Sequence, residues 1–574
     1  MVTTRYYQRE LEYLRVLAAE FARAHPAVAP LLSGPSSDPD VERLLEGTAY
    51  LAGQMVQKLD EGYDRIAENL CSLILPQLLR DVPSCTVTTF SPKAALSEIL
   101  ILPKGTRTAS VEVDGVSCIF STAYPVELAP LRLAGVKTES SPGKQAGLRF
   151  DFTMTFPLAL RSIRRLRLFL RGQRVDAVHR LYFLLRHTER VSLDIGGNRR
   201  SLPGSALSPV GFAPEEALIP YPATAWPGYR LLQEYYIFPE KFFFLDINLP
   251  DSVADAKGMP AFSCTLEFRR PLPDDIPSFA VDDFALFATP SVNLFPHETT
   301  PVKADQRQES YPIRANSSKS GAYIPYQVTA VRGIAPDAPD RERAYPPLLA
   351  AGRDPNSPSY MTVYEKTETG GREMRLALVR PPGIPVPAPE MISMSVLYSN
   401  GELPGHLNVG DLREALSTSP GLADFTNLIP PSKPAPAPAE GNVLWSLLAH
   451  LQLNYLPLAD AQTARALLSA YLPGKTDALY SGANAKRIAS ILSLDVQQTD
   501  YLWKGRPVRG SDILITLDES GFSNIGDMHL FGMVLAAFLH DYSPINSFVR
   551  VTVADSQNKY RFQWLKHEKM RSPR

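Results

Sequence analysis

Apolar residues in the first 80 positions of the chain recur at intervals of three and four, which is the spacing of one face of an α-helix. The first run consists of Tyr7, Leu11, Leu14, Ala18 and Phe21. This run must end before Pro26, because a proline has no backbone N–H and its ring clashes with the preceding helical turn. We therefore predict that the chain opens with an amphipathic helix that stops before Pro26.

A second helix is predicted to begin at residues 38–42. Asp38 can cap the helix, and Pro39 suits the first turn, where a missing N–H costs nothing. Asp40 and Glu42 place negative charge at the end of the helix where the macrodipole is positive.

The apolar stripe of this second helix continues for more than 30 residues, which is longer than a typical globular helix. Its positions are Val41, Leu44, Leu45, Leu51, Met55, Leu59, Tyr63, Ile66, Leu70 and Leu73. Gly47, Gly53 and Gly62 lie inside it, and each weakens a helix by roughly 1 kcal/mol relative to alanine, so tight packing must compensate. The stripe is either packed within its own chain or covered by other chains, and the pattern leaves both possibilities open.

From Cys85 to about Phe268 the apolar period changes to two, which predicts β-strands. The clearest runs alternate at Leu148–Phe156, Leu166–Leu170 and Phe262–Phe268. Clusters of proline and glycine separate the runs, so we predict a mostly antiparallel sheet domain.

A proline-rich middle follows, with three further strands predicted at 361–364, 374–379 and 392–398. Residues 430–441 read PPSKPAPAPAEG, a composition typical of a stiff, extended linker. Beyond it we predict helices at 443–455, 459–472, 482–494 and 528–540, with strands at 512–517 and 546–553.

These patterns predict a multidomain α+β protein. It begins with a helical region (1–82), continues through a β-rich domain (83–285) and a second, proline-rich β domain (286–430), and ends with a linker (431–441) and a mixed α/β domain (442–574). A length of 574 residues is too great for a single core.

Composition narrows the class of protein. The net charge is −1, so the molecule as a whole has no general attraction to nucleic acid or anionic lipid. Four widely spaced cysteines form no Cys-x-x-Cys pair and favour a reducing compartment. The start of the sequence shows no secretory signal, and the apolar stretch at 531–539 is far short of the roughly 20 residues that cross a bilayer. We expect a cytoplasmic protein.

The sequence contains only near-misses to known catalytic motifs. Ser469–Thr476 (SAYLPGKT) resembles a phosphate-binding loop, but Ser469 replaces its first glycine and a predicted helix, not a strand, precedes it. The pairs His297-Glu298 and His567-Glu568 lack the second histidine of a zinc protease. Ser523 lies in a sequence that has Ile525 where a nucleophile elbow needs glycine. We expect no enzymatic activity, cofactor, metal or small-molecule substrate.

Eleven arginines and no lysines lie between Arg161 and Arg200, and Arg165 and Arg167 share a strand face. One interpretation is a solvated sheet face with local ion pairs, whose charge reversal would hardly affect folding. Another is a docking face for an acidic protein, since guanidinium groups pair well with carboxylates. Nucleic acid is disfavoured, because the neighbouring aromatic residues alternate with leucines as core residues do.

Several blocks of the sequence resemble the TssF family of type VI secretion baseplate subunits. The opening blocks are YYQRELEYLRVLAAEFARAHP (Tyr6–Pro26) and DPDVERLLEGTAYLAGQMVQKLD (Asp38–Asp60). The later blocks are YRLLQEYYIFPEKFFFLDI (229–247), TPSVNLF (289–295), SNGELPGHL (399–407), FTNLIPP (425–431), LWSLLAHLQLNYLPLAD (444–460) and PINSF (544–548). The blocks are collinear and span nearly the whole chain, which makes the resemblance specific.

The resemblance implies a structural protein of a cytoplasmic baseplate related to contractile phage tails. Two TssF copies would join one TssG, bind TssK and TssE, dock on the inner-membrane complex and start assembly of the tail tube and sheath. A wedge protein of a contractile phage tail or phage-like device is the nearest alternative.

In this family a helical bundle is expected to join the TssF copies to TssG. We therefore expect the N-terminal stripe and the arginine face to meet partner chains. The candidate interface residues are Leu11, Leu14, Leu44, Leu45, Leu51, Met55, Leu59, Arg165 and Arg167.

Overall fold

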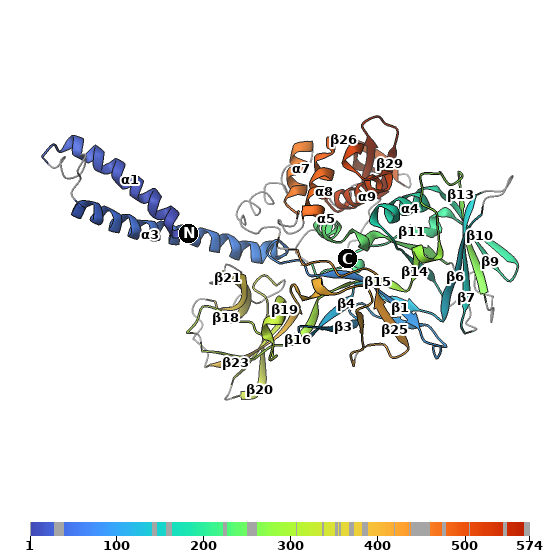
Figure 1. Ribbon diagram of the computed structural model, residues 1–574, viewed down its shortest axis with the longest axis horizontal. Helices are drawn as coiled ribbons and strands as arrows, with labels where there is room; N and C mark the ends of the chain where they lie inside the picture. The colour runs from blue at the N-terminus through green and yellow to red at the C-terminus, as the bar shows by residue number, and fades with distance from the viewer. Residues whose placement is uncertain are drawn as a thin grey trace.

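The computed structural model of the chain (Figure 1) describes most of its length. The described residues are 2–27, 39–139, 146–156, 163–221, 227–249, 261–305, 307–335, 338–350, 354, 357–366, 372–381, 389–417, 419–435, 437, 460–472, 478–503, 506–542 and 548–566.

Two antiparallel helices at the N-terminus project from the body of the molecule (Figure 1). They are α1 (Val2–Ala24) and α3 (Pro39–Ile74). Helix α1 ends before Pro26 and α3 begins at Pro39 with Asp40 and Glu42 in its first turn, so both predicted helices are confirmed. The far end of α3 enters the body, where Cys71 and Leu75 join the main core.

The centre of the molecule is a six-stranded antiparallel sheet in the order β24-β3-β4-β15-β1-β25. Its strands are β24 (Leu412–Glu414), β3 (Arg107–Val113), β4 (Val116–Thr122), β15 (Ala288–Val292), β1 (Cys85–Pro92) and β25 (Ala423–Asn427). The sheet combines strands from both sides of the predicted boundary at 285/286, and that division of the chain stays a prediction.

Three further sheets complete the first β-rich region. The five-stranded sheet contains β10 (Asn198–Pro203), β9 (Thr188–Ile195), β13 (Ala261–Phe268), β7 (Gly147–Met154) and β6 (Leu131–Glu139). The four-stranded sheet contains β11 (Leu207–Pro209), β12 (Phe244–Asn248), β8 (Arg165–Leu170) and β14 (Phe284–Leu286). The smallest pairs β2 (Leu100–Leu102) with β5 (Val126–Leu128).

The proline-rich region builds two sheets around a second, smaller core. The larger contains β16 (Phe295–Glu298), β23 (Glu390–Ser399), β19 (Ile324–Ala335) and β20 (Ala338–Tyr345), and β17 (Val302–Ala304) also pairs with β23. The smaller contains β18 (Tyr311–Pro312), β22 (Arg372–Val379) and β21 (Ser359–Lys366).

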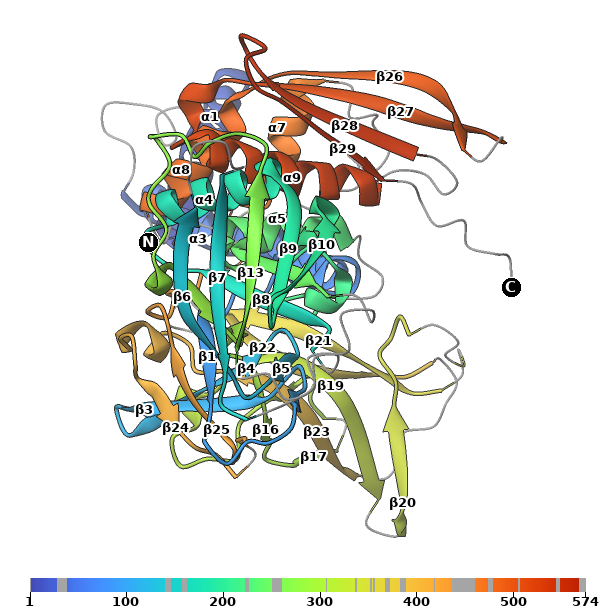
Figure 2. The ribbon, with the colours of Figure 1, turned by 90° about the vertical axis from the view of Figure 1, so that its right-hand side faces the viewer.

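The C-terminal region is a mixed sheet on a layer of helices (Figure 2). Its strands are β26 (Ile491–Trp503), β27 (Arg506–Leu517), β28 (Phe548–Asp555) and β29 (Arg561–Lys566), and its helices are α7 (Ala461–Ser469), α8 (Ala478–Ala489) and α9 (Ile525–Tyr542). Strands β27 and β28 are parallel, with α9 as the crossover between them. The predicted α+β architecture, with helices first, antiparallel sheets in the centre and a mixed C-terminal unit, is confirmed.

Some local predictions are wrong. Helices α4 (Arg174–His187) and α5 (Pro227–Ile237) interrupt the region predicted as sheet. Both are buried on most sides, so they lack the polar face that reveals a surface helix. The helix predicted at 482–494 ends at Ala489, and its last residues belong to β26.

The proline-rich segment at 430–441 is held against the body where the structure describes it. Ala435 pairs with Val82, the Ser432 hydroxyl accepts a hydrogen bond from the Cys85 N–H at 3.0 Å, and Asp81 accepts one from the Ala437 N–H. Residues 438–459, including the predicted helix at 443–455, lie outside the described residues.

A buried histidine lies at the seam between the C-terminal unit and the β-rich body. His529 on α9 contacts Tyr182 of α4 and Phe562 of β29, with ring centroids 5.2 and 4.9 Å apart. Burial, together with the nearby Arg186 and His187, lowers the pKa of His529 to about 3.

Mild acid is therefore expected to destabilise the fold. The unfolded chain takes up a proton near pH 6.5, before the folded chain can, so stability falls as the pH drops below that value. Between about pH 6.5 and about pH 5, His529 alone should lower the free energy of unfolding by about 2 kcal/mol. Chemical denaturation across this range should show a smaller loss in His529→Phe and the full loss in His406→Phe, which alters an exposed imidazole. The same loss in both variants would contradict the assignment.

Candidate protein-interaction site

The projecting hairpin is held together by small and apolar residues that face each other across α1 and α3. Ala22 and Ala49 are almost fully buried. At Gly53 the helices touch, because a Cβ built there would lie 3.0 Å from the Tyr7 backbone nitrogen. A glycine that weakens the isolated helix thus permits close contact between the two helices.

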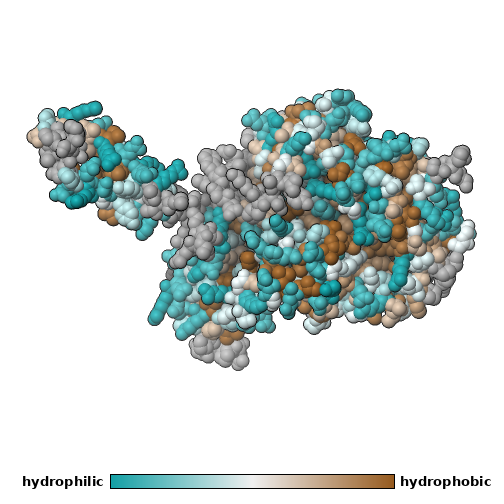
Figure 3. All heavy atoms as spheres, viewed as in Figure 1, coloured by the Kyte–Doolittle hydropathy of each residue, from teal (hydrophilic) through white to brown (hydrophobic). Residues whose placement is uncertain are grey.

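Both helices also carry a second apolar stripe that the hairpin leaves exposed. On α3 the exposed fractions are 72% for Leu44, 59% for Leu51, 67% for Met55 and 63% for Leu59. Apolar residues are likewise exposed on the projecting arm in Figure 3. On α1 the exposed members are Tyr13, Leu17 and Phe21, with the half-buried Tyr6 in line before them.

The two stripes have the same spacing, since Tyr6, Tyr13, Leu17 and Phe21 repeat the intervals of Leu44, Leu51, Met55 and Leu59. At about 100° per residue, each stripe lies roughly 120° around its helix from the residues that face the other helix, and in the same rotational sense. Because the helices are antiparallel, equal rotations bring both stripes to the same side of the hairpin. We call this surface, formed by the two stripes, the hairpin face.

The structure divides the predicted interface residues of the hairpin into two groups. Leu11, Leu14 and Leu45 are half-buried, on the sides where α1 and α3 pack against each other. The exposed Leu44, Leu51, Met55 and Leu59 make the α3 half of the hairpin face. The α1 half was not selected from the sequence, although Phe21 belongs to the predicted periodicity and the spacing shared with α3 would have indicated it.

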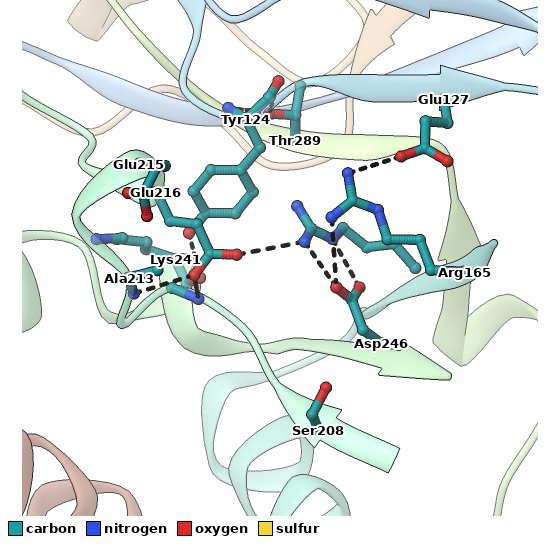
Figure 4. Close-up of polar contacts among 12 residues, drawn as sticks. Tyr124, Glu127, Arg165, Ser208, Ala213, Glu215, Glu216, Lys241, Asp246 and Thr289 are labelled. Atoms are coloured by element: carbon teal, nitrogen blue, oxygen red, sulfur yellow. Dashed lines mark hydrogen bonds and ion pairs between the residues drawn. The ribbon is translucent and has the colours of Figure 1, made fainter. Parts of the chain in front are cut away.

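The predicted arginine pair lies on β8, on the same side of the strand. Arg165 binds Glu127 at 2.9 Å (Figure 4). Arg167 binds both oxygens of Asp246 at 2.7 Å. Arg167 also contacts Glu216 at 3.3 Å and lies over the Tyr124 ring. Burial opposes the charge of Arg167, but Asp246 and Glu216 outweigh that effect and raise its pKa.

A solvated arginine face is therefore wrong for Arg167, whose side chain is only 11% exposed. Its carboxylate partners come from strands and turns far away in the sequence, so strand periodicity could not reveal them. That Arg165 and Arg167 contact another protein stays a prediction.

A second buried ionic cluster lies in the block YRLLQEYYIFPEK. Glu234 on α5 binds Arg230 at 2.9 Å and also binds Lys241, and all three side chains are almost inaccessible to solvent. Glu234 further accepts the Leu218 N–H at 2.7 Å. Burial lowers the pKa of Lys241 to about 8 against the attraction of Glu234. This cluster was not predicted from the sequence, although the i, i+4 spacing of Arg230 and Glu234 on a helix was a signal.

The catalytic near-misses have structural roles where the structure describes them. Ser469 is the last residue of α7, and Gly474–Thr476 lie outside the described residues, as does His567. The Asn524 side chain caps α9 by accepting the Asp527 N–H at 2.9 Å, and the Ser523 hydroxyl binds Asp527. His297 stacks on Tyr323.

The described residues contain no group of three or more histidine, cysteine or acidic side chains arranged to hold a metal. Over the same part of the chain, every helix is too short or too polar to span a membrane.

A family model described as "Type VI secretion system, TssF" matches residues 2–570. The chain belongs to the TssF family. It is 29% identical over 615 aligned positions to type VI secretion system component TssF1 of Pseudomonas aeruginosa, with 97% of each chain covered. The resemblance seen in the sequence is confirmed, and TssF proteins are structural baseplate components, not enzymes.

Two solved structures support the same assignment. A chain of a TssK-TssF-TssG baseplate subcomplex matches with a TM-score of 0.77 and 26% identity, covering 93% of this chain and 99% of that one. A chain of a type VI baseplate complex matches with a TM-score of 0.62 and 25% identity over the full length of both. The TssF fold therefore extends over nearly the whole chain.

Proposed function

We propose that this chain is a structural subunit of a type VI baseplate wedge, in which two copies join one TssG through the hairpin face. In this proposal the heterotrimer binds TssK and TssE, docks at the inner face of the inner membrane and starts assembly of tail tube and sheath. The hairpin face carries the proposal, because no described element of the chain covers its leucines. The chain resembles one chain of a TssK-TssF-TssG subcomplex, which supports the choice of TssG and TssK as partners.

The spacing of the α3 stripe suits contact with a long partner helix. Leu44, Met55 and Ile66 are 11 residues apart, as are Leu59 and Leu70, and all are exposed. An 11-residue period corresponds to about 3.67 residues per turn, close to the α-helix itself. The stripe therefore stays almost parallel to the axis of α3, and a nearly straight helix can follow it.

Met55→Asp is expected to abolish recovery of TssG without unfolding the chain. Its side chain is exposed in the isolated subunit, whereas a carboxylate buried in an apolar interface costs several kcal/mol. The measurement is co-purification with TssG of the same system, together with the melting temperature of each variant. Gln54→Asp is the matched control, because it alters the neighbouring exposed position about 100° around the helix.

Two other stripe positions sharpen this test. Leu51→Asp should behave like Met55→Asp, whereas Leu45→Asp should lower the melting temperature, because Leu45 is half-buried within the hairpin. Equal recovery of TssG by Met55→Asp and Gln54→Asp would contradict the proposal. So would aggregation of Met55→Asp in the absence of partners.

A further inference from the structure

Four exposed arginines lie close together where the ends of α4 and β13 meet the start of β29. We call them the seam arginines: Arg186, Arg269, Arg270 and Arg561. The Arg269 N–H donates to the His187 carbonyl at 2.9 Å. The Arg186 guanidinium donates to the Arg561 carbonyl at 3.5 Å and lies over the Phe562 ring. The cluster therefore combines three arginines of the β-rich body, Arg186, Arg269 and Arg270, with Arg561 of the C-terminal unit.

The seam arginines differ in their partners from three arginines of the 161–200 run. Arg165, Arg180 and Arg199 each bind a carboxylate of the chain within 3 Å. Within the described part of the chain, none of the seam arginines has a carboxylate within ion-pairing distance. Asp275 acts on Tyr182 together with Arg270 and Arg186, but it forms no ion pair with a seam arginine, so positive charge is in excess at this seam.

The pKa of the neighbouring His187 responds to the same positive charges. Burial lowers its pKa, and the charges of Arg270, Arg186 and Arg269 lower it further, to about 4. The charges that act on this imidazole are all positive. Three of the seam arginines are therefore close enough to one point to reinforce one another.

We propose that the seam arginines form a docking surface for an acidic segment of a partner protein. Guanidinium groups bind carboxylates through two parallel hydrogen bonds, and arginine loses little rotamer freedom for each bond formed. Nucleic acid fits less well, because Tyr182 and Phe562 at the same seam are buried and offer no surface on which bases can stack.

The seam arginines lie on elements other than the hairpin, so this proposal goes beyond the proposed contact with TssG. Either proposal can be wrong while the other is right. Loss of TssG through Met55→Asp tests the hairpin face only. Charge reversal at the seam tests the second surface only.

The first experiment measures binding of a fluorescent peptide of about ten glutamates to the full chain by anisotropy. Arg270→Glu/Arg561→Glu should weaken binding at least about tenfold, because like charges at an interface cost several kcal/mol. Arg307→Glu/Arg413→Glu is the control, since it makes the same charge change at two exposed arginines elsewhere. An equal loss of peptide binding in both variants would show that binding depends only on net charge, and it would overturn the proposal.

Two further measurements decide the kind of partner. Binding of single-stranded RNA and of phosphatidylserine vesicles is measured with the same variants. If the seam variant lost binding only to RNA, or only to the vesicles, the surface would recognise that class of partner and the proposal of an acidic protein segment would be overturned. In cells that lack the native subunit, the seam variant should fail to support sheath assembly while the control variant supports it. Normal assembly with the seam variant, at an unchanged melting temperature, would also overturn the proposal.

Discussion

Arg167→Glu is expected to lower the free energy of unfolding by more than about 5 kcal/mol, which is comparable to the whole stability of many domains. The substitution would remove the cation that binds Asp246 and Glu216 and put a third carboxylate in its place. Removing one partner of a buried ion pair already costs about 3–5 kcal/mol, and the added repulsion increases that loss. Thermal or chemical unfolding of the isolated chain measures it.

A double-mutant cycle tests whether Asp246 is the reason. Arg167→Met should be strongly destabilising, and Arg167→Met/Asp246→Leu should recover a large part of the loss, because the second change removes the stranded carboxylate. Arg165→Glu is the control on the same strand face, where the side chain is 31% exposed and the cost should be nearer 1 kcal/mol. Similar losses for Arg165→Glu and Arg167→Glu would contradict the role of burial.

Glu234→Gln is expected to destabilise the chain by about 3–5 kcal/mol. Glu234 is the buried anion that compensates two buried cations, Arg230 and Lys241, and it also accepts backbone N–H groups of Leu218 and Ile219. A glutamine keeps the shape and one acceptor but loses the charge, so Arg230 remains a buried cation without its anion, and Lys241 loses the attraction that opposes the lowering of its pKa by burial. Chemical denaturation of the variant beside the unaltered chain measures the difference.

Lys241→Met provides the companion measurement. It removes one cation and leaves Glu234 bound to Arg230, so its cost should be smaller than that of Glu234→Gln. Adding Lys241→Met to Glu234→Gln should then restore part of the lost stability, because only one unpaired cation remains. If the double variant were as unstable as the sum of the two single variants, the cluster would not act as an ionic unit.

The two ionic clusters hold the same stretch of chain against the body. Glu216 binds Arg167 and accepts the Gly211 N–H, while Glu234 accepts the N–H groups of Leu218 and Ile219. Between β11 and α5 the described residues, 210–221, contain one short 3-10 helix (Pro214–Glu216) and no strand. Ionic contacts therefore fix the position of this segment, as backbone hydrogen bonds between strands do elsewhere in the fold.

Local physical chemistry made much of this protein predictable from its sequence. The limits of α1 and the start of α3 depend on Pro26 and Pro39, whose effects on the backbone do not need the rest of the molecule. Alternation along β8 and β13 likewise predicted strands, because successive side chains on a strand point to opposite faces. Family membership followed from blocks of residues that keep their order along the chain.

Only the tertiary structure decided which charges and which apolar residues are covered. Arg167 and Arg270 look alike in the sequence, yet Asp246 and Glu216 neutralise the first, while the structure brings no carboxylate within ion-pairing distance of the second among the described residues. Leu44 and Leu45 are adjacent, yet one is exposed and the other half-buried, because antiparallel packing of α1 covers only one side of α3. Periodicity describes a single helix or strand, whereas burial and ion pairing depend on residues that the fold brings together from distant parts of the chain.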